Sequence, residues 1–380
     1  MKKIGIMSMQ RIANYGSFLQ AYALKQLIEE LDCKVEFVDY HVGAPVITEN
    51  ADSKNKFVRK VEKGLETFQY QAPFAHKLSF IHYKQSFSKK YMPLLGITDE
   101  MNYNPTLDCL VIGSDEVFNC IQKNSNVGYS PELFGKDNHA KRIITYAASF
   151  GNTTLEKLTK YKKADEVGAF LKKFDAISVR DANSGAIVKQ LIGKKPVYNL
   201  DPVLTYDYMN CCDKIPQFQA DEKYLILYAY AGRISNEEAD WISAYAKRKS
   251  LKVYAIGGIQ KCADRFVDCS PFEVLAYFRN AEEVITDTFH GSIFSVITHR
   301  PFTTLIRKSV GNGYGNEEKV SDLLGRLELN ARITTRVEET ENINSTLIDY
   351  SRTDRILQKC RENAKQYLTL QIEESGKWEN

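Results

Sequence analysis

The sequence predicts an α/β protein made of two Rossmann-like halves that face each other across a cleft. Its 380 residues exceed the ~100–200 residues of an ordinary domain, so two compact units are expected. Short apolar runs alternate with helical periods along the chain, which is typical of parallel sheets covered by helices. This alternation breaks once, near residues 213–222, where Pro216 and polar residues separate two series of strands.

The first series predicts an N-terminal Rossmann-like domain over residues 1–215. Residues 14–17 indicate a turn after the first strand, and apolar side chains at helical spacing follow that turn as far as Leu31. The strands of this domain are expected at residues 4–9, 35–40, 107–112, 143–148, 176–179 and 197–200.

Residues 47–92 are the least regular stretch of this domain, with lysines interleaved among aromatic residues. We expect a helical insertion that is solvated. The alternative is a basic and aromatic surface that touches an anionic membrane.

The second series predicts a C-terminal Rossmann-like domain over residues 216–345. Ser270 is an N-cap and Glu273 completes a capping box, so a helix is expected to begin there. The other helices are expected near 237–247 and from residue 292, and the strands at 224–230, 251–256, 283–287 and 302–306. Within the last segment, 346–380, a helix over about 353–370 carries an apolar stripe that would pack back on the body.

Composition and charge argue against several classes of protein. The 51 Lys and Arg residues nearly balance 48 Asp and Glu, whereas a nucleic-acid binder usually carries a clustered positive excess. The 6 histidines and 8 cysteines show no spacing typical of a metal site. No apolar run approaches the ~18 residues that cross a bilayer, and no signal peptide is recognised. We therefore expect a cytoplasmic protein with neither a nucleic-acid partner nor a bound metal.

Ionisable residues gather where the predicted strands end. In a parallel sheet these ends share one edge, where loops and helix N-termini bind ligands. Arg180 ends a strand of the first half and suits two-pronged recognition of carboxylate or phosphate, with an ion pair to Asp181 as the alternative. His290 lies at a strand end of the second half, where a protonated imidazole would pair with phosphate or donate a proton.

Two carboxylates occupy similar positions. Asp115 and Asp287 each come at the end of a predicted strand. Each is a candidate base, and each would equally serve as the N-cap of a following helix. Two such edges facing each other would form a polar pocket suited to a small anion.

Five ordered motifs resemble those of the polysaccharide pyruvyl transferase family. They are NYGSFLQAYAL at residues 14–24, GSDEVFN at 113–119, SVRD at 178–181, DPV at 201–203 and TDTFHG at 286–291. The resemblance implies a fold like that of B-type glycosyltransferases. It also implies transfer of the carbon skeleton of phosphoenolpyruvate to two hydroxyls of a sugar, which gives a cyclic ketal and phosphate.

The resemblance implies roles for individual residues. The donor-binding arginine and histidine of the family map onto Arg180 and His290; His290 is also a candidate for proton transfer, and Asp115 is the candidate base. Thr288 stands where some members carry arginine, so that anion contact is either absent or supplied from elsewhere, with Arg307 and Lys308 at the next strand end as candidates. The residues expected to contact substrate are Arg180, Asn14, Tyr15, Gly16, Ser17, Ser114, Thr288, Gly291, Arg307 and Lys308.

The implied reaction uses phosphoenolpyruvate as donor, needs no cofactor, and takes a glycan or lipid-linked oligosaccharide as acceptor. A lipid-linked acceptor would bring the protein to the inner face of the membrane. Glu116 and Phe118 stand where glutamine and tryptophan are commoner in the family. If this loop contacts the acceptor, those contacts differ from the ones that the family pattern implies. Two other functions stay open: a nucleotide-sugar-dependent glycosyltransferase, which the same fold would serve, and a non-catalytic binding relative.

Overall fold

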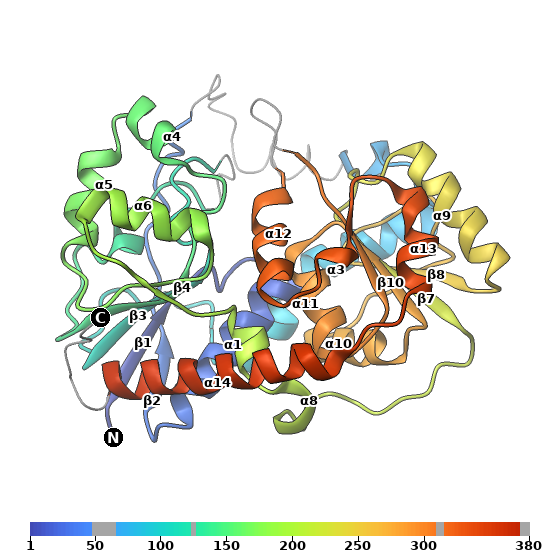
Figure 1. Cartoon of the computed structure of the whole chain (residues 1–380). Helices are drawn as coiled ribbons and strands as arrows, with labels where there is room; N and C mark the ends of the chain where they lie inside the picture. The colour runs from blue at the N-terminus through green and yellow to red at the C-terminus, as the bar shows by residue number, and fades with distance from the viewer. Residues whose placement is uncertain (48–65, 123–126, 309–314, 373–380) are drawn as a thin grey trace.

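Figure 1 shows the computed structural model of the chain, which describes residues 1–47, 66–122, 127–308 and 315–372. Its strands form two sheets of six, and neighbouring strands are parallel throughout both sheets. The expected fold class, an α/β protein of two Rossmann-like halves, is confirmed.

The first sheet contains the six strands that the alternating pattern of the first half predicts. Its order is β2 (Lys34–Phe37), β1 (Lys3–Met7), β3 (Cys109–Asp115), β4 (Ile143–Ala148), β5 (Ser178–Val179) and β6 (Val197–Tyr198). The order reverses between β1 and β3, where Ile6 lies beside Val111. At such a switch point the connections leave on opposite faces and open a crevice beyond the strand ends.

The second sheet repeats this plan. Its order is β12 (Ile333–Thr334), β11 (Phe302–Leu305), β10 (Glu283–Thr286), β7 (Tyr224–Tyr228), β8 (Lys252–Ile256) and β9 (Arg265–Phe266). The switch point lies between β7 and β10, where Leu227 pairs with Ile285. The two-residue strands β9 and β12 were not predicted from the sequence.

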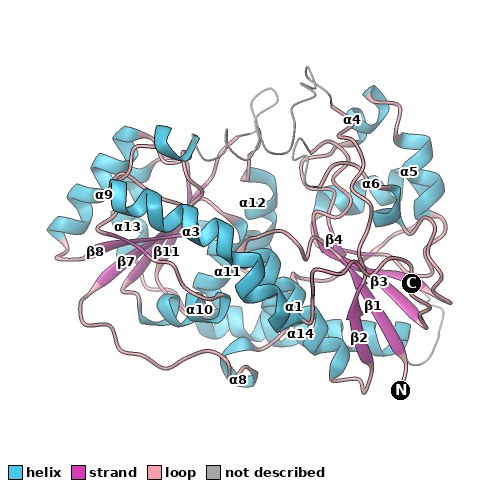
Figure 2. Ribbon diagram, turned by 180° about the vertical axis from the view of Figure 1, so that it is seen from behind, coloured by secondary structure: helices cyan, strands magenta, loops and turns pink. Residues whose placement is uncertain are grey.

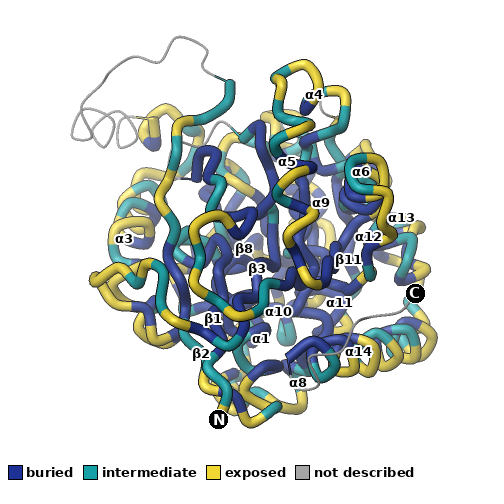
Figure 3. Tube along the Cα trace, turned by 90° about the vertical axis from the view of Figure 1, so that its left-hand side faces the viewer, coloured by how far each residue is buried: buried dark blue, intermediate teal, exposed yellow. Residues whose placement is uncertain are grey.

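Helices pack around both sheets, and Figure 3 shows the strands buried inside while exposed residues lie on the outer helices. In the first half they are α1 (Tyr15–Glu29), α3 (Phe74–Tyr91), α4 (Leu155–Lys160), α5 (Ala164–Leu171), α6 (Ala182–Ile192), α7 (Pro202–Thr205) and α8 (Tyr208–Cys211). In the second half they are α9 (Asn236–Arg248), α10 (Pro271–Asn280), α11 (Phe289–Ile297), α12 (Glu317–Arg326), α13 (Thr340–Ser345) and α14 (Tyr350–Ile372). The predicted boundary between residues 215 and 216 falls in the connection from α8 to β7.

Two helices begin earlier than the sequence predicts. Residues 14–17 are not a turn: α1 starts at Tyr15, and the Asn14 side chain caps it by accepting a hydrogen bond from the Gly16 amide. Helix α11 starts at Phe289 rather than at residue 292, because the Thr288 hydroxyl accepts from the Gly291 amide. Both N-caps therefore stand at the carboxyl edges of the sheets.

An aromatic core joins the two halves. The ring of Phe272 on α10 meets two rings of α1 edge to face, Phe18 at 5.7 Å and Tyr22 at 4.9 Å between centroids. Such contacts bury large apolar areas and fix the orientation of the packed elements. The halves are thus held by a continuous apolar interface beneath the cleft.

The insertion expected at residues 47–92 is partly described, since residues 48–65 lie outside the described part of the chain. Its helix α3 is visible on the side of the molecule seen in Figure 2. The expectation of a solvated excursion is wrong for its aromatic face. Phe80, Tyr83 and Phe87 are buried, and Phe80 meets Phe266 of the second half at 5.6 Å. Helix α3 therefore also ties the halves together.

Helix α14 crosses beneath both halves, as the red helix of Figure 1 shows. Near its start, the Tyr350 hydroxyl donates to the main-chain oxygen of Arg300 at 2.7 Å. Near its end, the Tyr367 hydroxyl donates to that of Thr145 in β4 at 2.8 Å. In the described part of the chain no helix is both long enough and apolar enough to cross a bilayer.

We expect Tyr367→Phe to lower the free energy of unfolding by about 1 kcal/mol, because it removes the buried hydrogen bond to Thr145. Urea unfolding followed by circular dichroism measures the change. Tyr103→Phe, at a side chain that is largely exposed, serves as the control and should have little effect. If both variants lose the same free energy of unfolding, the hydrogen bond from Tyr367 does not stabilise the packing of α14.

Candidate functional site

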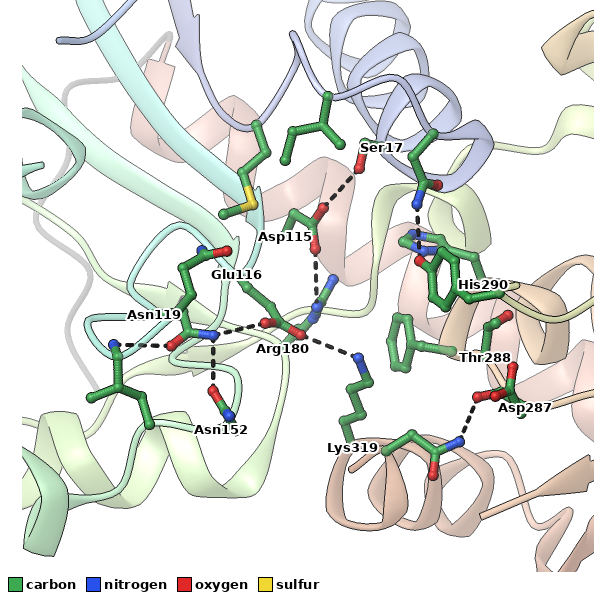
Figure 4. A pocket seen from close by; sticks show the side chains of 18 of the residues that line it. Ser17, Asp115, Glu116, Asn119, Asn152, Arg180, Asp287, Thr288, His290 and Lys319 are labelled. Carbon is green, nitrogen blue, oxygen red and sulfur yellow. Dashed lines mark hydrogen bonds and ion pairs between the residues drawn. The ribbon is translucent and has the colours of Figure 1, made fainter. Parts of the chain in front are cut away.

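A pocket of about 790 Å³ lies between the carboxyl edges of the two sheets (Figure 4). The first half supplies residues that follow β1, β3 and β5, among them Asn14, Asp115 and Arg180. The second half supplies residues that follow β7 and β10, among them Tyr230 and His290. The pocket therefore uses the switch points of both sheets, and the predicted cleft is present there.

Arg180 forms the floor of the pocket. Its side chain is 3% exposed and donates from Nη1 to Asp201 Oδ2 at 3.0 Å and from Nη2 to Asp115 Oδ1 at 3.3 Å. Its guanidinium also lies 4.6 Å from the ring centre of Phe289 in the opposite half. Burial lowers the pKa of Arg180, but the charges of Asp115 and Asp201 outweigh it and raise that pKa.

The partners of Arg180 differ from the ion pair that the sequence offered as an alternative. Asp181 instead caps α6, where it accepts from the Ser184 amide at 2.8 Å and from the Ser149 hydroxyl at 2.6 Å. Asp181 caps α6, whereas Arg180 lines the pocket. These two neighbouring residues therefore have different roles.

His290 lies in the first turn of α11, over the first turn of α1. Its Nε2 is 3.7 Å from Asp201 Oδ2 and has no hydrogen-bond partner among the described residues. A Cβ at Gly16 would stand 2.2 Å from its Nδ1, so only glycine lets the ring approach this closely. Burial would raise the pKa of Asp201, yet the contacts with His290 and Arg180 hold it below its usual value.

Asp201 therefore joins the two residues on which the sequence prediction depends. Its carboxylate lies within 3.0 Å of the Arg180 guanidinium and 3.7 Å of the His290 imidazole. Arg180 and His290, from opposite halves, both line the same pocket. Only the tertiary structure could reveal this shared carboxylate.

The two candidate bases have different surroundings, and neither is an N-cap. Asp115 ends β3 and accepts hydrogen bonds from Arg180 and, at 3.3 Å, from the Ser17 hydroxyl. Asp287 is fully buried, and its nearest cation is Arg233, at 3.8 Å. Burial raises the pKa of Asp287 to about 6, against the opposing charges of Arg233 and Arg307.

Two contacts cross the mouth of the pocket from one half to the other. Lys319 Nζ on α12 lies 3.2 Å from Glu116 Oε1, and the Asn14 amide donates to the Tyr230 hydroxyl at 2.9 Å. Sequence reasoning missed Lys319 and Tyr230, because neither belongs to a motif. In the sequence Glu116 stands out only as a departure from the family pattern. In the structure its carboxylate pairs with Lys319 across the mouth of the pocket.

Six of the residues expected at the site line the pocket: Asn14, Ser17, Asp115, Arg180, Thr288 and His290. Four others stand just behind its wall. Tyr15 is buried in the aromatic core and its hydroxyl donates to the Cys269 main chain. Gly16 supports the His290 ring, Ser114 donates to Asp201 at 3.5 Å, and Gly291 donates its amide to Thr288.

The expectation that Arg307 or Lys308 replaces the arginine absent at Thr288 is not met, since neither residue lines the pocket. Arg307 is held by Glu238 through two hydrogen bonds of 2.7 and 2.9 Å, and Lys308 is exposed. Other cations do reach the pocket. They are Lys84, Lys157, Lys160, Arg233 and Lys319.

A second cavity, of about 1170 Å³, adjoins the pocket and shares Met9, Ile12, Ala13, Lys84 and Tyr230 with it. Its wall includes the rings of Tyr40, Tyr70 and Tyr103. Among the described residues no group of three or more His, Cys, Asp or Glu side chains is arranged to hold a metal ion. The site is thus a charged pocket beside a larger, partly aromatic one.

Fold and site together define a two-domain α/β protein whose polar, cation-bearing pocket spans the switch points of both sheets. The sequence model of the polysaccharide pyruvyl transferase family matches residues 14–309. The chain belongs to this family, as its motifs indicated. A search of the curated proteins gave no match.

Several solved structures are similar to this chain over nearly its whole length, at low sequence identity. S. aureus MnaA in complex with UDP is 11% identical, with a TM-score of 0.49, over 99% of this chain and 97% of that one. A putative UDP-N-acetylglucosamine 2-epimerase from Listeria monocytogenes is 12% identical, with a TM-score of 0.45, over 100% and 99%. Acinetobacter baumannii MurG is 12% identical, with a TM-score of 0.42, over 98% and 100%.

We expect Arg180→Ala to lower the free energy of unfolding by ~3–5 kcal/mol, because it leaves Asp115 and Asp201 without their cation. The loss should shrink as the pH falls below about 4, since Asp201, whose pKa is held low in the native state, then becomes protonated. Urea unfolding at neutral and acid pH measures both effects.

The control is Arg336→Ala, at an exposed arginine whose ion pairs are long. Such pairs contribute roughly 0–1 kcal/mol. If both variants lose the same stability at neutral pH, the Arg180 network is not the buried ion pair described above.

Proposed function

We propose that this protein transfers the pyruvyl group of phosphoenolpyruvate to two hydroxyls of a sugar in a polysaccharide or its precursor. The products are a cyclic pyruvate ketal and phosphate. One observation carries the proposal within this family: Arg180 and His290, from opposite halves, converge on Asp201 at the floor of one pocket.

The pocket suits a small ligand that bears both a carboxylate and a phosphate. Removing these groups from water is unfavourable unless cations and N–H donors replace the lost hydration. Arg180, Arg233, Lys319 and His290 supply cationic or donor groups. The N-termini of α1 and α11, whose caps are Asn14 and Thr288, both open on the same space and favour negative charge.

The reaction needs no cofactor, because its atoms balance between donor and acceptor. A proton must reach the methylene carbon, one sugar oxygen must bond to the central carbon, and a second must displace the phosphate. Asp115 is the proposed base for a hydroxyl, since its carboxylate lies on the pocket and is oriented by Ser17 and Arg180. One hydroxyl proton ends in the product methyl group, and the other leaves with phosphate.

The adjoining cavity is the proposed site of the acceptor. Its tyrosine rings and polar groups suit a sugar, which offers both C–H faces and hydroxyls. It meets the donor pocket at Met9, Ile12 and Tyr230, so an acceptor hydroxyl there would approach the donor. A glycan end or a lipid-linked oligosaccharide would present the same sugar chemistry.

We expect phosphoenolpyruvate to stabilise the protein against thermal unfolding. At about 100 times its dissociation constant, a ligand that binds only the native state adds ~2.7 kcal/mol. Differential scanning calorimetry with phosphoenolpyruvate, UDP-N-acetylglucosamine and inorganic phosphate measures the effect. Stabilisation by the nucleotide sugar alone would favour a glycosyltransferase, and stabilisation by phosphoenolpyruvate with no phosphate release in the presence of acceptor would favour a non-catalytic relative.

We expect Gly16→Ala to weaken phosphoenolpyruvate binding by roughly 10–100-fold, the equivalent of one charge-assisted hydrogen bond. The added Cβ would stand 2.2 Å from His290 Nδ1 and push the imidazole out of place. Isothermal titration calorimetry measures the affinity. Gly168→Ala on α5 is the matched control, because its Cβ would meet Leu191 at ordinary contact distances of 3.6 and 3.7 Å. Unchanged affinity in both variants would exclude His290 from donor binding.

A further inference from the structure

Asp287 is a charged group of the pocket that the donor-binding contacts leave unexplained. Its side chain is fully buried, yet the residue lines the pocket (Figure 4). Neither carboxylate oxygen has a side-chain hydrogen-bond partner among the described residues, and the nearest cation, Arg233, is 3.8 Å away. A buried carboxylate without such partners is unfavourable, so the group holds a proton more tightly than an exposed carboxyl does.

Two other carboxylates of the pocket, Asp115 and Glu116, have close partners. Asp115 accepts hydrogen bonds from Arg180 and Ser17, and Glu116 lies 3.2 Å from Lys319. Both carboxylates are thus engaged by donors or cations at close range. Asp287 differs from them in being fully buried with no such close partner, and burial raises its pKa.

The main chain around Asp287 is held in place from several sides. The Asn316 amide donates to the main-chain oxygen of Asp287 at 2.6 Å and to that of Leu305 at 3.1 Å. Thr288, the next residue, caps α11. Asp287 is thus fixed between β10 and α11, three residues before His290. This is the precision that an acid needs in order to deliver its proton to a defined atom.

We propose that Asp287 is the acid that protonates the methylene carbon of phosphoenolpyruvate; this inference rests on the proposed function. The proton leaves the Asp287 carboxyl and the carbon–carbon π electrons form the new C–H bond of the methyl group. The central carbon becomes electron-deficient, and a sugar hydroxyl oxygen attacks it while Asp115 takes the hydroxyl proton. The second hydroxyl then displaces phosphate, which leaves with that hydroxyl's proton.

The cycle closes without any other reactant. The proton on Asp115 returns through water to Asp287, so each turnover consumes two hydroxyl protons and releases none. The charged groups that face Asp287 are Arg233 after β7, Arg307 after β11 and Glu238 on α9. The two arginines stabilise the carboxylate that forms on proton transfer. Burial raises the pKa of Asp287 and so favours the return of a proton to it.

Binding of phosphoenolpyruvate tests this assignment without knowledge of the acceptor. Because burial raises the pKa of Asp287 to about 6, most of these carboxyls are ionised at pH 7.5 in the free protein. An anionic donor beside the carboxylate raises that pKa further, so binding should take up protons. Isothermal titration calorimetry in two buffers of different ionisation enthalpy measures this uptake.

We expect Asp287→Asn to bind phosphoenolpyruvate but to take up fewer protons than the wild type. The difference in proton uptake between the wild type and the variant reports on Asp287, because His290 and the donor phosphate are present in both measurements. Phosphate release from phosphoenolpyruvate, with water as the acceptor, should also fall by ~10²-fold or more. Glu283→Gln, at a buried carboxyl of the preceding strand β10 that does not line the pocket, should match the wild type in both measurements.

The outcomes separate the two proposals. If the wild type does not bind phosphoenolpyruvate, the proposed function fails. If both proteins bind it with the same proton uptake, phosphoenolpyruvate remains the donor and Asp287 is not its acid. Loss of binding in Asp287→Asn, with the fold intact by circular dichroism, would make Asp287 a binding residue and would also overturn the assignment.

Discussion

The buried contact between Asp201 and Arg180, with His290 beside it, is the interaction on which the rest of the pocket depends. A single carboxylate holds a guanidinium from the first half and faces an imidazole from the second. Removing two charges from water is unfavourable, so this arrangement persists only because the geometry on every side is fixed. It sets where positive charge is presented and makes the pocket a property of both halves together.

That geometry is fixed by apolar packing outside the pocket. Helices α1, α3 and α10 bring aromatic side chains of both halves into one core, and α14 bonds to each half in turn. Rigid packing below lets the N-termini of α1 and α11 converge above. A site organised before the ligand arrives stabilises developing charge without reorganisation, and this suits a reaction in which a charged phosphate departs.

Two aspartates of the pocket illustrate how one residue type can serve two purposes. Asp115 accepts hydrogen bonds from Ser17 and Arg180, which orient its carboxylate for the role of a base. Asp287 is fully buried with its nearest cation 3.8 Å away, and burial raises its pKa to about 6. Environments that separate the charge states of two carboxyl groups are a common means of providing a base and an acid in one site.

The amino-acid sequence by itself determined the alternation of strands and helices, the two series of strands, the family, and the strand ends at which Arg180 and His290 stand. These features follow from local periodicity, from caps and from motifs, all of which are properties of neighbouring residues. The sequence did not predict that Tyr15 is buried in the aromatic core or that Arg307 pairs with Glu238. Nor did it predict that Lys319 brings a positive charge to the pocket. Only the tertiary structure decided these, because ion pairing and burial depend on distances between segments far apart in the chain.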